Sequence, residues 1–87
     1  MEQRTEKLQE TINTLHKGQW TVVTSNPVEH EFVNGSEILR VSYLDGNTWT
    51  LEYKNQRTGD EKSLGKVHSD SLILEWRAFV QDALEIN

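Results

Sequence analysis

The segment Val28–Tyr53, VEHEFVNGSEILRVSYLDGNTWTLEY, decides the fold of this 87-residue chain. It contains three short runs in which apolar or aromatic side chains alternate with polar ones. Strict alternation is typical of a strand with one buried face. Asn34-Gly35 and Asp45-Gly46 separate the runs, and both dipeptides favour tight hairpin turns. The runs predict three antiparallel strands with these inward residues: Val28, His30 and Phe32; Leu39, Val41 and Tyr43; Trp49, Leu51 and Tyr53.

The turn residues and the apolar pattern together predict the strand register. A two-residue turn at Asn34-Gly35 keeps the apolar sets of the first two strands on one face. At the second turn, a one-residue slip would move every apolar side chain of the third strand to the opposite face. The apolar pattern therefore favours a three-residue loop over 45–47 with one residue in the left-handed region. The predicted pairs are Val28 with Val41, His30 with Leu39, Tyr43 with Trp49, Val41 with Leu51, and Leu39 with Tyr53.

The same register brings opposite charges together on the other face of the sheet. Arg40 is expected opposite Glu29 on one neighbouring strand and opposite Glu52 on the other. Such cross-strand pairs contribute about 0.2–1 kcal/mol each. Registers chosen from the apolar pattern thus also pair complementary charges, which supports the sheet.

Two further segments are predicted before this sheet. Apolar residues recur at helical spacing over 5–17, and Gly18 stands where a left-handed C-cap residue is expected. A β-rich stretch over 20–24 predicts a short strand, which Asn26-Pro27 ends. The apolar stripe of the helix consists of Leu8, Ile12 and Leu15.

A second helix is predicted over 70–84, after the sheet. Ser69 or Asp70 is the expected N-cap. Leu74 falls on the polar side of this helix, where an exposed leucine is either incidental or marks a contact. The broad apolar face consists of Leu72, Ile73, Trp76, Phe79, Val80 and Ala83.

Residues 55–68 allow two interpretations. Thr58-Gly59 either closes a hairpin that places Leu64 opposite Tyr53 in an edge strand, or lies in a polar, mobile loop. The pattern slightly favours the strand.

These elements predict one two-layer α+β domain over 1–87. It consists of an N-terminal helix, an antiparallel sheet of three to five strands in meander order, and a C-terminal helix packed on one sheet face. A chain of this length buries only about 60% of its unfolded surface. Its three Trp, two Tyr and two Phe supply the large apolar areas that such a core needs.

The composition excludes several classes of function. The chain has no Cys, which excludes disulfides and thiolate metal sites and fits a reducing cytoplasm. It has no apolar signal region and no run of about 18 apolar residues, so we expect a cytoplasmic protein without membrane association. Its net charge of −5 disfavours direct binding to nucleic-acid phosphates.

The residue patterns indicate no catalytic site, cofactor or metal. His16, His30 and His68 lie too far apart in the sequence for a helical metal pair, and His30 is expected to be a packed, hydrogen-bonded residue. The chain has neither a nucleophile elbow nor a Gly-rich phosphate-binding motif. We therefore expect a non-enzymatic protein.

The remaining chemistry is that of an acidic interaction surface. Acidic side chains on the outward sheet face and on the second helix either maintain solubility or complement a basic partner. We interpret the chain as a protein-binding module whose partner presents a basic surface. The candidate contact residues are Glu29, Glu31, Arg40, Glu52, Leu74 and Asp82.

In size, acidity and helix–sheet–helix order, the chain resembles the small inhibitors made by phages and other mobile elements, including anti-CRISPR proteins. The resemblance implies an inhibitor that occludes a basic nucleic-acid-binding site on a larger enzyme. Two alternatives remain open. One is a structural or oligomeric accessory subunit that self-associates through Leu74, Ile38 and Val33, and the other is a single-stranded RNA-binding domain that stacks bases on its aromatic side chains.

Overall fold

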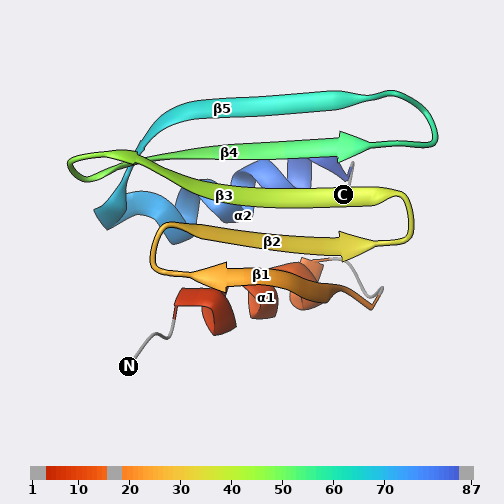
Figure 1. Cartoon of the computed structure of the whole chain (residues 1–87), viewed down its shortest axis with the longest axis horizontal. Helices are drawn as coiled ribbons and strands as arrows, with labels where there is room; N and C mark the ends of the chain where they lie inside the picture. The colour runs from red at the N-terminus through yellow and green to blue at the C-terminus, as the bar shows by residue number, and fades with distance from the viewer. Residues whose placement is uncertain (1–3, 16–18, 85–87) are drawn as a thin grey trace.

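The computed structural model describes residues 4–15 and 19–84 and confirms the α+β fold (Figure 1). Five antiparallel strands follow one another in meander order, with a helix before them and a helix after them. The elements are α1 (Arg4–Leu15), β1 (Thr21–Asn26), β2 (Glu29–Asn34), β3 (Glu37–Asp45), β4 (Thr48–Asn55), β5 (Glu61–His68), a short 3₁₀ turn (Ser69–Ser71) and α2 (Leu72–Ala83).

Both helices lie on one face of the sheet, which we call the inner face (Figure 1). α2 packs on β4 and β5, and α1 packs on α2 and contacts β1 and β2. The opposite face, the outer face, carries neither helix. The apolar core between the layers includes Leu8, Ile12, Trp20, Phe32, Leu39, Val41, Trp49, Leu51, Tyr53, Val67, Leu72, Trp76, Phe79, Val80 and Ala83.

Trp76 ties the two helices together at the centre of this core. Its indole Nε1 donates a hydrogen bond of 3.0 Å to the backbone carbonyl of Leu8, and its side chain is fully buried. Its ring lies 6.0 Å from that of Phe32 and 6.3 Å from that of Phe79. A buried indole needs such an acceptor, because an unpaired N–H in an apolar core is costly.

The predicted β3–β4 register is confirmed in all three apolar pairs. The connection between the two strands differs from the predicted three-residue loop, however. Asp45 pairs with Thr48 around the two-residue turn Gly46-Asn47, and Leu44 forms a β-bulge in β3. Gly46 has a φ of 54°, so the predicted left-handed residue is present.

The predicted β2–β3 pairs are wrong by two residues. His30 pairs with Val41, and Phe32 pairs with Leu39. The turn is centred on Gly35-Ser36 rather than Asn34-Gly35, with Gly35 at a φ of 61°. Glycine at the first central position is the requirement of a type II′ turn. Because the error is an even number of residues, every side chain keeps its predicted face.

Val28 and Tyr43 were predicted in the core, but they are 53% and 40% exposed. Val28 is not a strand residue: it lies in the turn after Pro27, and its N–H donates to the Asn26 side chain. On its β2 side, Tyr43 therefore lies beside a turn residue rather than a strand residue, and its hydroxyl donates to the carbonyl of Gly46 at 2.6 Å.

The residues after β4 form a strand, as the favoured interpretation predicted, but in another register. Leu64 pairs with Leu51 rather than with Tyr53. Farther along, Gly65 and Lys66 together face a single β4 residue, and Lys66 has a φ of 59°. This bulge turns Val67 onto the inner face, where it is buried.

The helix ends differ from their predictions in detail. Neither Ser69 nor Asp70 caps the C-terminal helix with its side chain. Instead, Nδ1 of His68 accepts a hydrogen bond of 3.1 Å from the Asp70 N–H, at the start of the 3₁₀ turn. The α-helix proper begins at Leu72. The predicted C-cap at Gly18 lies outside the described residues.

The bulge in β5 makes an unusual stability prediction. A non-glycine residue in the left-handed region costs about 1–2 kcal/mol. We expect Lys66→Gly to raise the free energy of unfolding by about 0.5 kcal/mol, and Lys66→Val to lower it by about 1 kcal/mol. Ordinary strand propensity ranks these two residues the other way round. Urea denaturation followed by Trp fluorescence measures both, and a more stable valine variant would contradict the bulge.

Candidate functional site

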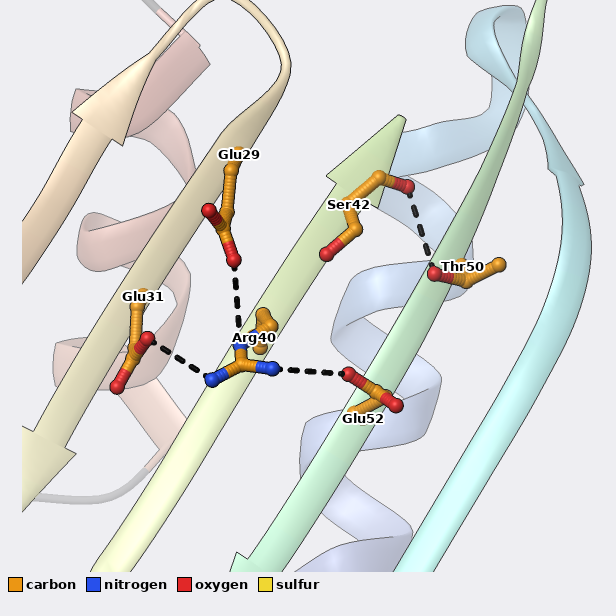
Figure 2. Close-up of polar contacts among 6 residues, drawn as sticks. All are labelled: Glu29, Glu31, Arg40, Ser42, Thr50 and Glu52. Atoms are coloured by element: carbon orange, nitrogen blue, oxygen red, sulfur yellow. Dashed lines mark hydrogen bonds and ion pairs between the residues drawn. The ribbon is translucent and has the colours of Figure 1, made fainter. Parts of the chain in front are cut away.

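Arg40 lies at the centre of the outer face and is surrounded by three carboxylates (Figure 2). Its Nε lies 3.4 Å from Oε2 of Glu29, its Nη2 lies 3.1 Å from Oε1 of Glu31, and its Nη1 lies 3.7 Å from Oε1 of Glu52. We call these four residues the Arg40 cluster. The sequence predicted all four members on this face.

One pairing within the Arg40 cluster differs from its prediction. Glu31, not Glu29, lies directly opposite Arg40 on β2, and Glu29 reaches it diagonally. Glu52 lies opposite Arg40 on β4, as predicted. The β2–β3 shift of two residues is the cause. It exchanges the direct and diagonal carboxylates but keeps both within reach of the guanidinium.

The Arg40 cluster carries a net charge of −2, because one guanidinium faces three carboxylates. The planar guanidinium presents N–H groups in several directions and remains charged at any ordinary pH. The Glu31 side chain is 17% exposed, whereas those of Glu29 and Glu52 are 38% and 51% exposed. Two carboxylates therefore remain open to an approaching cation.

The neighbouring surface is polar and shallow. Thr50 donates a long hydrogen bond of 3.5 Å to the carbonyl of Ser42 beside the cluster (Figure 2). On the other side, an open groove of about 620 Å³ runs from Arg40 toward β5. Its lining includes Ile38, Glu52, Lys54, Glu61 and Ser63.

Leu74 and Asp82, the other two candidates, do not belong to this surface. Both lie on α2, in the layer on the inner face. Leu74 is 73% exposed, as expected for the polar side of the helix. Asp82 forms a 2.8 Å ion pair with Lys62 of β5, a contact that the sequence did not predict.

His30 and Tyr53 are buried residues that form hydrogen bonds within the fold. His30 is fully buried, and its Nδ1 lies 2.7 Å from the hydroxyl of Thr5, so the predicted packed, hydrogen-bonded histidine is confirmed. The Tyr53 hydroxyl donates to Oε2 of Glu37 at 2.9 Å. Burial raises the pKa of Tyr53, and the adjacent Glu37 carboxylate raises it further.

Within residues 4–15 and 19–84, no group of three His, Asp or Glu side chains is arranged to hold a metal ion. In the same part of the chain, neither helix has the length and apolar character that a membrane crossing requires. What the described surface offers is charge and hydrogen bonding on an open sheet face.

The sequence matches no protein-family model, and no curated protein or solved structure matches it. The geometry and charge of the surface are therefore what indicate its function.

Replacing Arg40 tests whether it neutralises the cluster. In Arg40→Gln, three carboxylates lose their shared cation, and we expect the free energy of unfolding to fall by about 1–2 kcal/mol at low salt. The loss should shrink in 1 M NaCl, where screening acts over about 3 Å. Arg77→Gln, on the exposed side of α2, is the matched control and should change stability by less than about 0.5 kcal/mol. Equal urea midpoints for both variants would show that the ion pairs contribute nothing.

Proposed function

We propose that this chain is a non-enzymatic binding module that captures a basic surface of another protein with its outer sheet face. The supporting observation is the Arg40 cluster, which concentrates a net charge of −2 on a face that neither helix covers. Two of its carboxylates are open to solvent.

Arg40 holds the carboxylates of this surface in fixed positions. Three carboxylates held within 3.1–3.7 Å of one guanidinium have restricted positions, so a partner's cations meet acceptors that are already placed. Positioned acceptors lower the ordering cost of association. Complementary charge also accelerates encounter and disfavours acidic partners.

An inhibitor is the form of this function that we favour. A five-stranded face with excess negative charge is opposite in sign, and therefore complementary, to the basic sites with which larger enzymes bind nucleic acids. Covering such a site would block the enzyme without any chemistry by the inhibitor.

The two alternatives receive less support. An accessory subunit was expected to self-associate through Val33, Ile38 and Leu74. Val33 pairs with Ile38 on the outer face, but Leu74 lies in the helical layer, so the three form no single patch. The aromatic residues considered for stacking RNA bases are Trp20, Tyr43, Trp49 and Tyr53. Of these four, only Tyr43 is exposed.

Neutralising the cluster tests the proposed function. The triple variant Glu29→Gln, Glu31→Gln and Glu52→Gln should bind nona-arginine, a defined basic probe, about tenfold more weakly than the unmodified chain at 50 mM NaCl. Isothermal titration calorimetry measures the dissociation constants. Gln is similar in size to Glu, so the sheet should persist, and far-UV circular dichroism checks that it does.

The matched control removes the same charge elsewhere. Glu6→Gln, Glu10→Gln and Asp70→Asn are exposed changes on α1 and in the 3₁₀ turn before α2. This variant has the same net charge as the cluster variant and should bind nona-arginine within about twofold of the unmodified chain. Equal losses in both variants would mean that overall charge alone attracts the probe, and the outer-face site would be rejected.

A further inference from the structure

β5 ends the sheet, and one side of its backbone has no strand beside it in the described part of the chain. The Asn55 N–H donates to the Asp60 carbonyl at 2.8 Å, which marks this pair as hydrogen-bonded. Hydrogen-bonded and non-hydrogen-bonded pairs alternate along an antiparallel ladder. The next hydrogen-bonded pairs are therefore Tyr53 with Lys62 and Leu51 with Leu64, so the backbone groups of Lys62 and Leu64 point toward β4. The N–H and C=O groups of Glu61 and Ser63, which alternate with these residues, therefore point away from the sheet.

The open part of this edge is short. The bulge at Gly65-Lys66 interrupts regular pairing beyond Leu64. Charged residues and bulges on an edge strand oppose long edge-to-edge association. At the opposite edge, β1 has its own bulge at Val23. Directly before β1, the side chain of Gln9 in α1 donates a hydrogen bond to the Trp20 carbonyl. Residues 61–64 are thus the regular stretch available to a short added strand.

A groove of about 410 Å³ lies beside this edge, between β5 and α2. Its apolar lining comes from Leu64, which is 39% exposed, and from Ala78 and Phe79 of α2. The Lys62–Asp82 ion pair crosses from strand to helix at one end. Glu75 supplies a carboxylate toward the other end.

The spacing of these groups fits the side-chain period of a strand. Glu75 and Phe79 are four residues apart on a helix, which separates them by about 6 Å. Successive side chains on one face of a strand are about 6.8 Å apart. A strand added to β5 would therefore place an apolar side chain between Leu64 and Phe79. Two residues farther on, just past the paired stretch, it would place a cationic side chain beside Glu75.

We propose that the β5 edge and the β5–α2 groove bind an extended segment of the partner protein by strand addition. The segment carries an apolar residue and a Lys or Arg two positions from it. Backbone hydrogen bonds to residues 61 and 63 supply affinity, and the groove supplies the side-chain preference. The inference deepens the proposed function, because it names a second contact made by the same basic partner. Asp82, one of the contact residues expected from the sequence, lines this groove.

A designed peptide tests the strand addition. The probe is acetyl-Thr-Lys-Thr-Val-Thr-Lys-Thr-amide, which has a Lys two positions from Val in either chain direction. The control peptide, acetyl-Lys-Thr-Thr-Val-Thr-Thr-Lys-amide, has the same composition with each Lys three positions from Val, on the other face of a strand. NMR titration of the ¹⁵N-labelled chain should give at least about fivefold tighter binding of the first peptide, with the largest shifts in residues 61–65.

Ser63→Pro tests the backbone contact. The Ser63 N–H points away from β4, so proline removes a donor that the sheet does not use, and edge positions tolerate it. We expect about tenfold weaker peptide binding for Ser63→Pro and less than about twofold change for Ser63→Ala, which keeps the N–H.

A second pair of variants tests the groove. Ala78→Arg should block the groove, while Gln81→Arg adds the same charge elsewhere on α2 and should leave binding unchanged.

Three outcomes would overturn the inference: equal binding of the two peptides, equal binding by Ser63→Pro and Ser63→Ala, or concentration-dependent dimers in sedimentation that Ser63→Pro abolishes. The last outcome would assign the edge to a second copy of the chain.

Nona-arginine binding tests the proposed function separately from this inference. Loss of nona-arginine binding only in the Glu29, Glu31 and Glu52 variant supports the Arg40 cluster whatever the peptides do.

Discussion

The antiparallel pairing of β3 with β4 is the constraint on which the other features depend. It sets Val41 against Leu51 on the inner face, where both are fully buried, and sets Arg40 against Glu52 on the outer face. A slip of one residue would bury the charges and expose the core, so the two faces enforce the same register. The bulge at Leu44 lets the strands keep that register through a two-residue turn.

From this pairing follow two chemically different surfaces. The outer face is charged because the helices occupy only the inner face, and Arg40 keeps three carboxylates close together there. The β5 edge is partly apolar because α2 packs on β4 and β5 but leaves Leu64 and Ala78 accessible. A partner segment that is both basic and extended would satisfy both surfaces, which is why we assign them to one partner.

Much of the fold could be predicted from the sequence, because face alternation does not depend on the turn type. All four residues of the Arg40 cluster were placed on one face, although the β2–β3 register was wrong by two residues. An even error preserves the faces, and only the direct partner of Arg40 changes. The turn itself was ambiguous, because Asn34-Gly35-Ser36 accommodates a type I′ turn at its first two residues or a type II′ turn at its last two.

The rest depended on contacts that a local pattern does not contain. Val28 resembled a strand residue, but the Asn26 side chain holds its N–H in a turn. The sequence around Lys66 gave no sign of a left-handed backbone, because that conformation belongs to the bulge that turns Val67 onto the inner face. The separation of Asp82 from the Arg40 cluster followed from the face on which α2 packs, which helical periodicity alone does not determine.

Mapping the contact surface of nona-arginine tests whether the outer face binds a basic partner. In ¹H–¹⁵N spectra of the labelled chain at low salt, we expect the largest shifts at residues 29–33, 38–42 and 50–54, which carry the outer face of β2, β3 and β4. Amides of α1 and α2 should change little. Shifts that are largest on the helices, or equal over both layers, would contradict a binding site at the Arg40 cluster.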